Sequence, residues 1–382
     1  MKHVTVPAFA ATFVAGGGRD IDTTRTPELA ALAQGEHVRL VDDRDEEVGL
    51  AIADPENARL RVMVLPSDGL TKVDGTLLAL RVERAVAWRK QLGLTGAYRL
   101  IHGAGDGLPG FTCDVLGDVA VIWVLGEGLR GLGKQLADAV IGFGKLAGAV
   151  VKLRARGGAE TVEQDVIGAV GDKHLADEAG LSFEIHALSG LNTGLFTDMR
   201  EQRRGLPRFA AGARVLNLFS YTGALGLACA RGGADRVTNV DTSQGVKAWA
   251  AGNFARAGFT GDRYRFEQGD AIRYLARAQK DKETYDLIVI DPPTFSPARG
   301  SPWVLDRDYP NLIGQAASVT REGGILWLAA NTHDLQSLAK LAAKGIRSVN
   351  RTAQVIEQGS LPPEYPTVVA QPGDRYLQIC AL

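Results

Sequence analysis

In the second half of the chain, short apolar runs typical of β-strands alternate with helical segments. The strand-like runs cover residues 214–218, 236–241, 264–267, 286–291, 325–329, 354–357 and 375–380. Helices are predicted between the early strands, for example over residues 224–231 and 244–257. This alternation is typical of βαβ units, which build a parallel, doubly wound α/β sheet. Ligands of such sheets bind beyond the carboxyl ends of the strands, so we expect the site there.

The first part of the chain has a different pattern. Residues 37–41, 47–52 and 59–65 are strand-like and are separated by turns rich in Asp, Asn and Pro, which predicts a small β-barrel. A helix that ends near Gly93 follows it. The chain of 382 residues is long enough for several domains. We expect a barrel over residues 1–72, a connecting helix with a small α+β domain over 73–190, and the doubly wound domain over 191–382.

The predicted central domain has strands near residues 99–102, 119–124 and 149–154 around one helix near 132–143. It contains a glycine-rich stretch, GAGDGLPG, at residues 103–110. A phosphate-binding loop opens onto a helix N-terminus, whereas this stretch opens onto strands. We interpret it as a structural turn, and a direct contact with substrate remains open.

The first strand of the doubly wound domain runs into a short polar turn before a helix of small residues. The candidate cofactor contacts in this turn are Asn217, Phe219, Tyr221, Thr222 and Gly223. A dinucleotide site would have G-x-G-x-x-G here, because the pyrophosphate must approach the backbone closely. The glycine pattern is absent, which argues against NAD and FAD and leaves a dehydrogenase as the weakest interpretation.

Acidic residues follow the next two strands. Asp241 ends the second strand, where its carboxylate can accept hydrogen bonds from both hydroxyls of a ribose. It can at the same time cap a helix over residues 242–257, and Thr242 and Ser243 are further candidate cofactor contacts. The third strand is followed by Asp270 and Ala271, where a carboxylate can accept a hydrogen bond from an adenine amino group.

The fourth strand ends in Asp291 and Pro292, within the sequence DPPTFS at residues 291–296. The four strand ends thus carry a turn, two carboxylates and an Asp-Pro-Pro segment with an aromatic residue. This arrangement suits a ribosyl-adenine ligand whose tail bears no phosphate. S-adenosylmethionine fits it better than any nucleotide, and we expect no metal.

These motifs resemble those of class I S-adenosylmethionine-dependent methyltransferases, and within them the enzymes of large-subunit ribosomal RNA. The resemblance is carried by TGLFTDMR (193–200), NLFSYTG (217–223), NVDTS (239–243) and DPPTFS (291–296), and it extends weakly to residues 98–118. It implies a Rossmann-like methyltransferase sheet and a PUA-like RNA-binding domain at the start of the chain. It also places Phe196, Asp198 and Arg200 over the cofactor.

The acceptor atom is constrained by a missing cysteine. Enzymes that methylate a pyrimidine at C5 first add a cysteine thiolate to the ring. In the 5-methylcytosine members that this protein resembles, a Cys follows the fifth strand, whereas Asn331 stands near that position here. The cysteines of this chain lie elsewhere, at residues 113, 229 and 380. A cysteine adduct is therefore not expected.

Methylation of a base nitrogen is the remaining interpretation. Asp291 and the carbonyl group of Pro292 can accept hydrogen bonds from a base edge, and Phe295 offers a surface on which a flipped base can stack. DPPTFS and an Asn near position 331 also resemble the 7-methylguanine branch of the family. We therefore predict Asp291, Pro292, Phe295 and Asn331 as catalytic residues. Residues 361–369 are more similar to the cytosine branch, so a 5-methylcytosine-type enzyme remains an alternative.

The charge composition gives little guidance about the partner. The 43 Lys and Arg residues and the 44 Asp and Glu residues leave a net charge of −1, so RNA binding would need a local basic patch. Candidate clusters lie at residues 81–90, 152–156 and 200–208, each of which is otherwise a solvated face. Methylation of a small molecule or protein amine, and a non-catalytic RNA-binding factor that holds the cofactor, remain open.

The location of the protein follows from what the sequence lacks. Residues 1–10 lack the charged region and long apolar core of a signal peptide, and no run of about 18 apolar residues could span a membrane, so we expect a cytoplasmic protein without a membrane partner. The three scattered cysteines predict neither a disulfide framework nor a zinc site. RNA, most of all large-subunit ribosomal RNA, is the expected partner, and a homodimer is left open.

Overall fold

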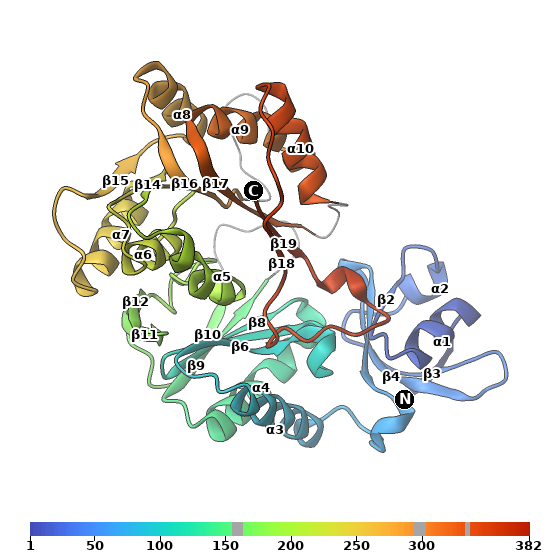
Figure 1. The fold of residues 1–382 in the computed structure, drawn as a ribbon. Coiled ribbons are helices and arrows are strands. Elements are labelled where there is room, and N and C mark those ends of the chain that lie inside the picture. The colour runs from blue at the N-terminus through green and yellow to red at the C-terminus, as the bar shows by residue number, and fades with distance from the viewer. Residues whose placement is uncertain (155–162, 294–302, 333–336) are drawn as a thin grey trace. The chain divides into compact units, whose positions relative to one another are not determined.

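The computed structural model describes residues 1–154, 163–293, 303–332 and 337–382. These residues form two compact units (Figure 1). The first unit comprises Met1–Glu178, Ile185–Thr193 and Pro363–Asp374. The second comprises Ala179–Glu184, Gly194–Pro362 and Arg375–Leu382. The expected division of the chain at residues 72 and 190 stays a prediction. In the described part of the chain, no helix has the length and apolar character needed to cross a membrane.

The N-terminal residues of the first unit form a five-stranded sheet with the order β1-β3-β4-β5-β2. Its strands are β1 (Lys2–Thr5), β2 (Asp20–Asp22), β3 (His37–Val41), β4 (Glu47–Asp54) and β5 (Arg59–Val64). The three predicted strands are β3, β4 and β5, while both edge strands and the helices α1 (Ala8–Ala15) and α2 (Pro27–Ala30) were not predicted. The similarity of this part to a PUA-like barrel stays a prediction.

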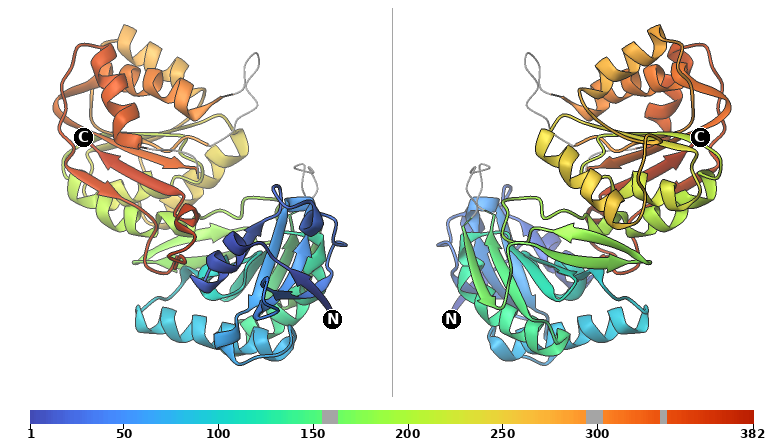
Figure 2. Two further views of the ribbon diagram at one scale, coloured as in Figure 1. Left: turned by 90° about the vertical axis from the view of Figure 1, so that its right-hand side faces the viewer. Right: turned by 90° about the vertical axis from the view of Figure 1, so that its left-hand side faces the viewer.

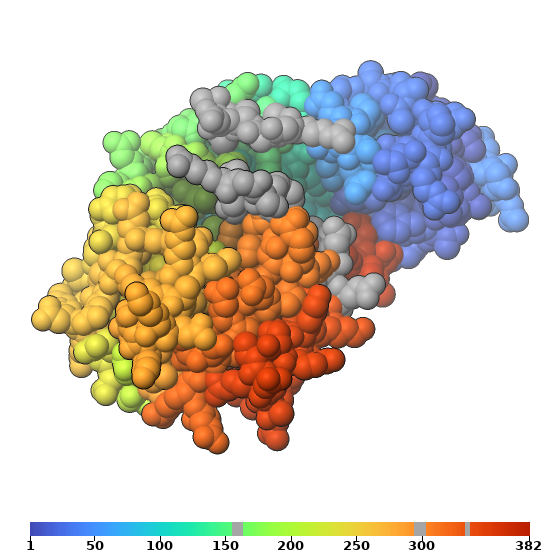
Figure 3. Space-filling model, turned by 90° about the horizontal axis from the view of Figure 1, so that it is seen from above, coloured from blue at the N-terminus to red at the C-terminus, as the bar shows by residue number. Residues whose placement is uncertain are grey.

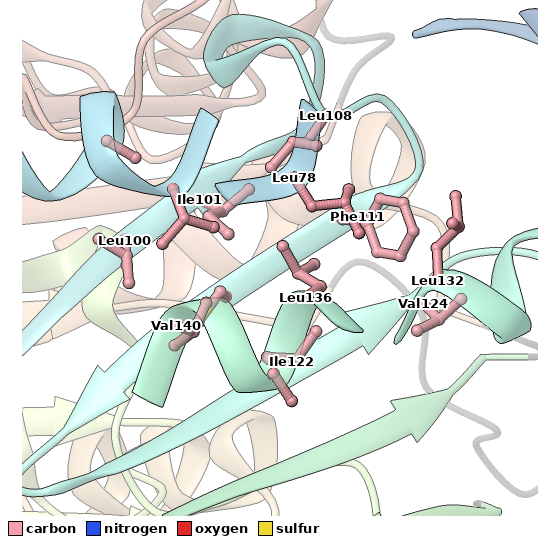
Figure 4. Packing of buried hydrophobic residues seen from close by; sticks show 14 of the residues in the cluster. Leu78, Leu100, Ile101, Leu108, Phe111, Ile122, Val124, Leu132, Leu136 and Val140 are labelled. Atoms are coloured by element: carbon pink, nitrogen blue, oxygen red, sulfur yellow. The ribbon is translucent and has the colours of Figure 1, made fainter. Parts of the chain in front are cut away.

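A second five-stranded sheet of the first unit has the order β10-β9-β8-β7-β6. Its strands are β6 (Ala97–His102), β7 (Phe111–Leu116), β8 (Val119–Val124), β9 (Gly148–Leu153) and β10 (Gln164–Gly168). The helices α3 (Gly75–Gln91) and α4 (Arg130–Gly144) pack on it through Leu78 and Leu136, which lie close to Leu100 and Phe111 (Figure 4). The central domain is thus α+β, as its sequence pattern predicts.

The two sheets of the first unit share one hydrophobic core. Leu50, Ile52, Met63 and Val64 lie on β4 and β5, yet they belong to the same buried cluster as the residues of the second sheet. In the space-filling view the blue residues of the first sheet lie directly against the light-blue and teal residues that follow them (Figure 3). One face of the first sheet is therefore buried in the core of the second, while its other residues pack with α1 and α2 in a separate core.

Pro363–Asp374 returns to the first unit from near the end of the chain. The Gln371 Oε1 atom accepts hydrogen bonds from the backbone N–H groups of Arg19, at 2.5 Å, and Asp20, at 3.2 Å. Arg89 donates to the carbonyl oxygen of Glu364 at 2.6 Å. The first unit is therefore completed by residues that lie about 270 to 350 positions later in the chain than the groups they bind.

The second unit contains a seven-stranded sheet with the order β15-β14-β13-β16-β17-β19-β18. The strands are β13 (Arg214–Leu218), β14 (Arg236–Asp241), β15 (Tyr264–Gln268), β16 (Tyr285–Ile290), β17 (Thr320–Asn331), β18 (Glu357–Gly359) and β19 (Leu377–Ala381). The strands from β15 to β17 pair in parallel, and β19 is antiparallel to both of its neighbours. This confirms the predicted doubly wound α/β domain. The strand predicted at 354–357 is wrong, because the structure places a strand only from Glu357 onward.

Helices cover both faces of this sheet (Figure 2). They are α5 (Arg200–Gly205), α6 (Ala224–Arg231), α7 (Gln244–Arg256), α8 (Ala271–Lys280), α9 (Leu305–Val319) and α10 (Leu338–Ser348). Leu216 and Ile288 form a core with α8, α9 and α10. Side chains alternate along a strand, so Asn217 points to the opposite face, where α6 packs. The chain leaves β13 for β14 and later returns to β16 beside β13, which makes the β13–β16 edge the topological switch point.

Candidate active site

The turn after β13 has an unusual backbone conformation. Phe219 and Tyr221 have φ values of 56° and 45°, in the left-handed region that residues with a side chain rarely adopt. The N–H of Ser220 donates to the carbonyl oxygen of Val240 at 3.0 Å, and the N–H of Tyr221 donates to Asp241 Oδ2 at 2.9 Å. These bonds hold the turn against the end of β14. Strained residues of this kind persist where the surrounding structure fixes them, often at ligand sites.

Thr222 and Gly223 connect this turn to other parts of the second unit. Thr222 is fully buried, and its Oγ1 donates to the carbonyl oxygen of Gly194 at 2.6 Å. The Asn253 amide donates to the Thr222 carbonyl oxygen at 3.0 Å. Gly223 caps α6 with a left-handed φ of 77°. Thr222 and Gly223 therefore set the shape of the turn, and Thr222 joins it to the start of the TGLFTDMR segment.

Asn217 lies below the turn rather than at its surface. Its Nδ2 donates to Asn239 Oδ1 at 2.9 Å, and both side chains are buried. A β-carbon at Gly226, on α6, would lie 2.2 Å from Asn239 Oδ1, so only glycine allows α6 to approach this amide pair. In the structure, the Asn217 side chain supports the turn from within the sheet. Its predicted contact with the cofactor stays a prediction.

An aromatic group lies beside the turn. The ring of Phe196 is 5.1 Å from that of Tyr221, which is 6.1 Å from that of Trp249. Phe196 is 47% exposed, so one face of this aromatic group is open to a ligand. Arg203 donates to the Phe196 carbonyl oxygen at 2.8 Å and fixes the backbone there. The resemblance placed Phe196 over the cofactor, and its exposure beside Tyr221 supports that placement.

Asp241 and Asp270 end or follow strands as predicted, but their local roles differ. Asp241 Oδ1 accepts from the N–H of Ser243 at 3.1 Å, and it is Ser243, not Asp241, that caps α7. Thr242 is exposed between them. Asp270 caps α8, because its Oδ1 accepts from the N–H of Arg273 at 3.0 Å. Ala271 is buried as the first residue of α8. The carboxylates of Asp241 and Asp270 are both partly or fully exposed and can accept further hydrogen bonds.

Asp291 follows β16 at the switch point, in an environment that disfavours its charge. Burial raises the pKa of Asp291 from its ordinary value of 3.8 to about 7, and the nearby Asp198 carboxylate adds to the rise, while Arg203 opposes it. Asp198 is itself buried, and its Oδ2 accepts from the Tyr376 hydroxyl at 3.1 Å. A carboxyl group with a pKa near 7 exchanges between its two protonation states at neutral pH, which is typical of functional sites.

Two further predicted site residues are buried. Pro292 follows Asp291 directly, and the predicted role of its carbonyl group as an acceptor for a base edge stays a prediction. Arg200, placed by the resemblance over the cofactor, is buried and pairs with Glu201 at 2.9 Å. Its predicted contact with the cofactor stays a prediction. Tyr309, on α9, was not predicted at all: its hydroxyl lies 3.1 Å from the carbonyl oxygen of Ile290 and 2.7 Å from that of Ala329. It joins the ends of β16 and β17, and no local sequence signal marks it.

The fifth strand position carries no thiol. Asn331 ends β17 and is exposed. Phe295 lies outside the described residues. The cysteines of the chain, Cys113, Cys229 and Cys380, are all buried, and burial raises the pKa of each thiol, that of Cys229 to about 12. No cysteine therefore has the accessible, readily ionised thiol that a nucleophile requires.

The basic clusters are less available than their charge indicates. Arg81 and Arg89 are buried and form ion pairs with Asp68 and Asp106. Lys152 is buried and donates to the carbonyl oxygen of Gly190 at 2.8 Å. The alternative of a solvated face is therefore wrong for Arg81, Arg89 and Lys152, which are buried. Within the described part of the chain, no group of His, Cys, Asp or Glu is arranged to hold a metal ion.

Comparison with known proteins identifies the family. A family model described as S-adenosylmethionine-dependent methyltransferase matches residues 129–379, which is more than half of the chain. The chain belongs to this methyltransferase family. A ribosomal RNA large subunit methyltransferase I of Shewanella denitrificans is 30% identical over 90% of this chain and 89% of its own length. The enzyme of that name from Cronobacter sakazakii is 29% identical over 91% and 90% of the two chains.

A solved structure is similar to this chain over its whole length. The crystal structure of SMU.776, a candidate methyltransferase complexed with SAH, has a TM-score of 0.89 and 25% sequence identity to this chain. The comparison covers 100% of this chain and 99% of the other. The chain is therefore an enzyme of the methyltransferase type that uses S-adenosylmethionine, as its strand-end residues predict.

The residues of this methyltransferase fit such a cofactor. The open carboxylate of Asp241 suits the two hydroxyls of a ribose, and the exposed carboxylate of Asp270 suits an amino group. The exposed Phe196 ring beside Tyr221 suits a planar base. We propose these residues as its binding site. Phe219, half-buried in the turn, packs near Trp303 with ring centroids 6.4 Å apart and closes the turn on the α9 side.

We expect the close contact between α6 and β14 to be essential for the stability of this methyltransferase. Gly226→Ala places a β-carbon against Asn239 Oδ1, so the variant should lose about 2–3 kcal/mol of unfolding free energy. Gly252→Ala on α7 is the matched control, because nothing lies within 4 Å of its β-carbon position. It should gain about 0.5–1 kcal/mol. Urea unfolding of both variants measures the difference, and equal stabilities would contradict the assigned packing.

Proposed function

We propose that this enzyme methylates a nitrogen atom of a base in large-subunit ribosomal RNA, of the 7-methylguanine type, in the cytoplasm. The observation that carries the proposal is a carboxyl group at the switch point, Asp291, with a pKa near 7, together with three cysteines that are all buried and whose thiol pKa values burial raises. The relatives named as large-subunit ribosomal RNA methyltransferases support RNA as the substrate class.

The chemistry of guanine N7 explains why methyl transfer would need no catalytic group besides Asp291. S-adenosylmethionine supplies an electrophilic methyl group when it is bound. Guanine N7 has a lone pair and no proton, so a base catalyst is not required, and positioning is the main contribution of the site. Positive charge develops on the purine ring as N7 is alkylated. The ionised carboxylate of Asp291 can stabilise that charge and accept a hydrogen bond from the base edge.

A 5-methylcytosine product would require different chemistry. The C5 atom of cytosine becomes nucleophilic only after a thiolate adds to C6 of the ring. Cys380 lies on β19 opposite Leu328 of β17 and is 1% exposed, and burial raises the pKa of its thiol. Cys113 and Cys229 are fully buried. These thiols are the opposite of the accessible, low-pKa cysteines that act as nucleophiles.

The product identifies the acceptor directly. We expect labelled S-adenosylmethionine and undermodified large-subunit ribosomal RNA to give labelled 7-methylguanosine after nuclease digestion and mass spectrometry. RNA containing 5-fluorocytidine, which traps thiolate adducts, should form no covalent complex with the protein. Cys380→Ser should retain methyl transfer within about two-fold, because a buried thiol takes no part in the reaction. Labelled 5-methylcytidine would contradict nitrogen methylation, and the absence of label in any RNA would overturn the proposed substrate.

A further inference from the structure

The first unit contains a cavity of 330 Å³ far from the strand ends in sequence. It is lined by Arg19, by Arg81 and Arg84 of α3, by the glycine-rich turn at 104–107, and by Val368 of the C-terminal segment. All of these residues belong to the first unit. None of the residues that line the cavity belongs to the proposed methyl transfer site. Three of the lining side chains carry positive charge.

The cations of this cavity are incompletely neutralised. Arg19 and Arg81 are 6% and 7% exposed and share one carboxylate oxygen, Asp68 Oδ2, at 3.4 and 2.5 Å. Asp68 Oδ2 also accepts from the N–H of Leu65 at 2.8 Å. One carboxylate thus balances one of the two buried guanidinium groups. Burial and the charge of Arg81 lower the pKa of Arg19, which is the expected effect of crowded cations.

The acidic residue of the lining does not correct this imbalance. Both oxygens of Asp106 accept from Arg89, at 2.5 and 2.8 Å, and its Oδ2 also accepts from the N–H of His102 at 2.6 Å. Asp106 is therefore neutralised by Arg89. Arg84, which is exposed one helical turn after Arg81, adds a further cation. The three guanidinium groups around the cavity are balanced by Asp68 and, for Arg19, by the charge of Asp20, whose Oδ1 is already bound to Arg61 at 2.7 Å.

One donor of this group is unsatisfied. Among the described residues, no acceptor lies within hydrogen-bonding distance of the buried Arg81 Nε. Gly107 has a φ of 73°, and a β-carbon there would lie 2.8 Å from this nitrogen. Glycine thus leaves room for the Arg81 guanidinium beside the turn. A buried, partly paired cation is costly unless an anion offsets its charge.

We infer that this cavity binds a phosphate group. Guanidinium groups match the geometry and charge of phosphate oxygens, and a volume of 330 Å³ is at the lower end of small-ligand sites. Leu65, Ala85 and Val368 give the cavity an apolar wall for the uncharged part of the ligand. The phosphate comes from a phosphodiester of the RNA, a source that rests on the proposed function, or from a free phosphate compound.

Direct titration tests the site without S-adenosylmethionine or RNA. We expect inorganic phosphate and glycerol 3-phosphate, which lack the adenosine that the cofactor site would bind, to bind the full-length protein in isothermal titration calorimetry at low salt, with chloride as the reference anion. Arg84→Ala should weaken this binding about five- to ten-fold, and Arg84→Glu should abolish it. Lys90→Ala is the matched control, because Lys90 is an exposed cation of α3 outside the cavity lining. Circular dichroism checks that all variants are folded.

The outcomes separate the site from the enzymatic activity. Binding of phosphate no tighter than chloride, or equal losses in Arg84→Ala and Lys90→Ala, would overturn the inference even if methyl transfer is intact. Loss of methyl transfer with phosphate binding intact would contradict only the proposed function. Competition between a ribosomal RNA fragment and glycerol 3-phosphate, with a salt slope lower by about one in Arg84→Ala, supports the RNA source. Binding of glycerol 3-phosphate that RNA does not displace supports a free phosphate ligand.

Discussion

Asp291→Asn should reduce methyl transfer by about 100-fold or more while S-adenosylmethionine still binds. The substitution keeps the size of the side chain but removes the negative charge that would stabilise a base ring as it is alkylated. Single-turnover methylation of ribosomal RNA measures the loss, and equilibrium dialysis with labelled cofactor measures binding. Asp286→Asn is the matched control, because Asp286 lies near the opposite end of β16, where it accepts from the N–H of Arg214 at 2.7 Å.

The Asp291 carboxyl group should also set the pH dependence of the methylation rate. With a pKa of about 7, Asp291 is neutral at pH 6 and ionised at pH 8. If the ionised form stabilises the base, the single-turnover rate rises through pH 7, and this rise disappears in Asp291→Asn. A rate that is flat between pH 6 and pH 8 in the wild-type enzyme, or an unchanged rise in the variant, would exclude Asp291 as the titrating group.

The stability of the folded enzyme should fall with rising pH, whereas the methylation rate rises. The folded pKa of Asp291 is raised above 3.8, so the unfolded state releases this proton first, and stability is lost as pH rises from about 4 to above 7. Asp291→Asn removes that loss and should unfold at a higher temperature than the wild type at pH 8, with a smaller difference at pH 5. Scanning calorimetry at both values checks the sign. A gain in stability with a loss of activity would mark Asp291 as a functional rather than a structural residue.

The second large effect is expected at the cofactor. Asp241→Ala should weaken S-adenosylmethionine binding about 100-fold, because two hydrogen bonds to a carboxylate contribute about 1.5 kcal/mol or more each. It also removes the acceptor of the Tyr221 N–H and so releases the strained turn after β13. Calorimetric titration measures the dissociation constant. Asp241→Asn should have an intermediate effect, since one acceptor oxygen remains.

Asp235→Ala controls for charge in the same strand. Asp235 is exposed immediately before β14, at the amino end of the strand whose carboxyl end carries Asp241. It should bind the cofactor as tightly as the wild type. If both variants weaken binding equally, the effect of Asp241 is a general loss of charge or stability, and its assignment to the ribose is wrong.

The central strands of the methyltransferase sheet could be predicted because burial determines their sequence. β13 and β14 are covered on both faces, so Val and Leu dominate their buried positions around the Asn217–Asn239 pair, and the bounds of β13, β14 and α6 agree with the prediction. Edge strands have no such pattern. β1 and β2, with sequences KHVT and DID, are strands only because they pair with β3 and β5. The short β18 likewise depends on its pairing with β19.

Some residues of the candidate site could likewise be predicted from the sequence, and others could not. The positions of Asp241 and Asp291 at strand ends follow from local pattern and topology. Tyr309 and Tyr376 do not, because their partners lie 20 and 178 residues away in the chain. The charges of Arg81 and Arg89 predicted surface exposure, yet both are buried, since the acidic partners that make this burial favourable come from separate loops.

The return of Pro363–Asp374 to the first unit has a consequence for biosynthesis. A ribosome releases the chain from its N-terminus, and domains usually fold in that order. Here the N-terminal unit receives Glu364 and Gln371 only after more than 360 residues have been synthesised. β19, an interior strand of the other sheet, is later still. The first unit therefore stays incomplete until residues 363–374 have been synthesised, and a premature stop before residue 363 removes a part of both units.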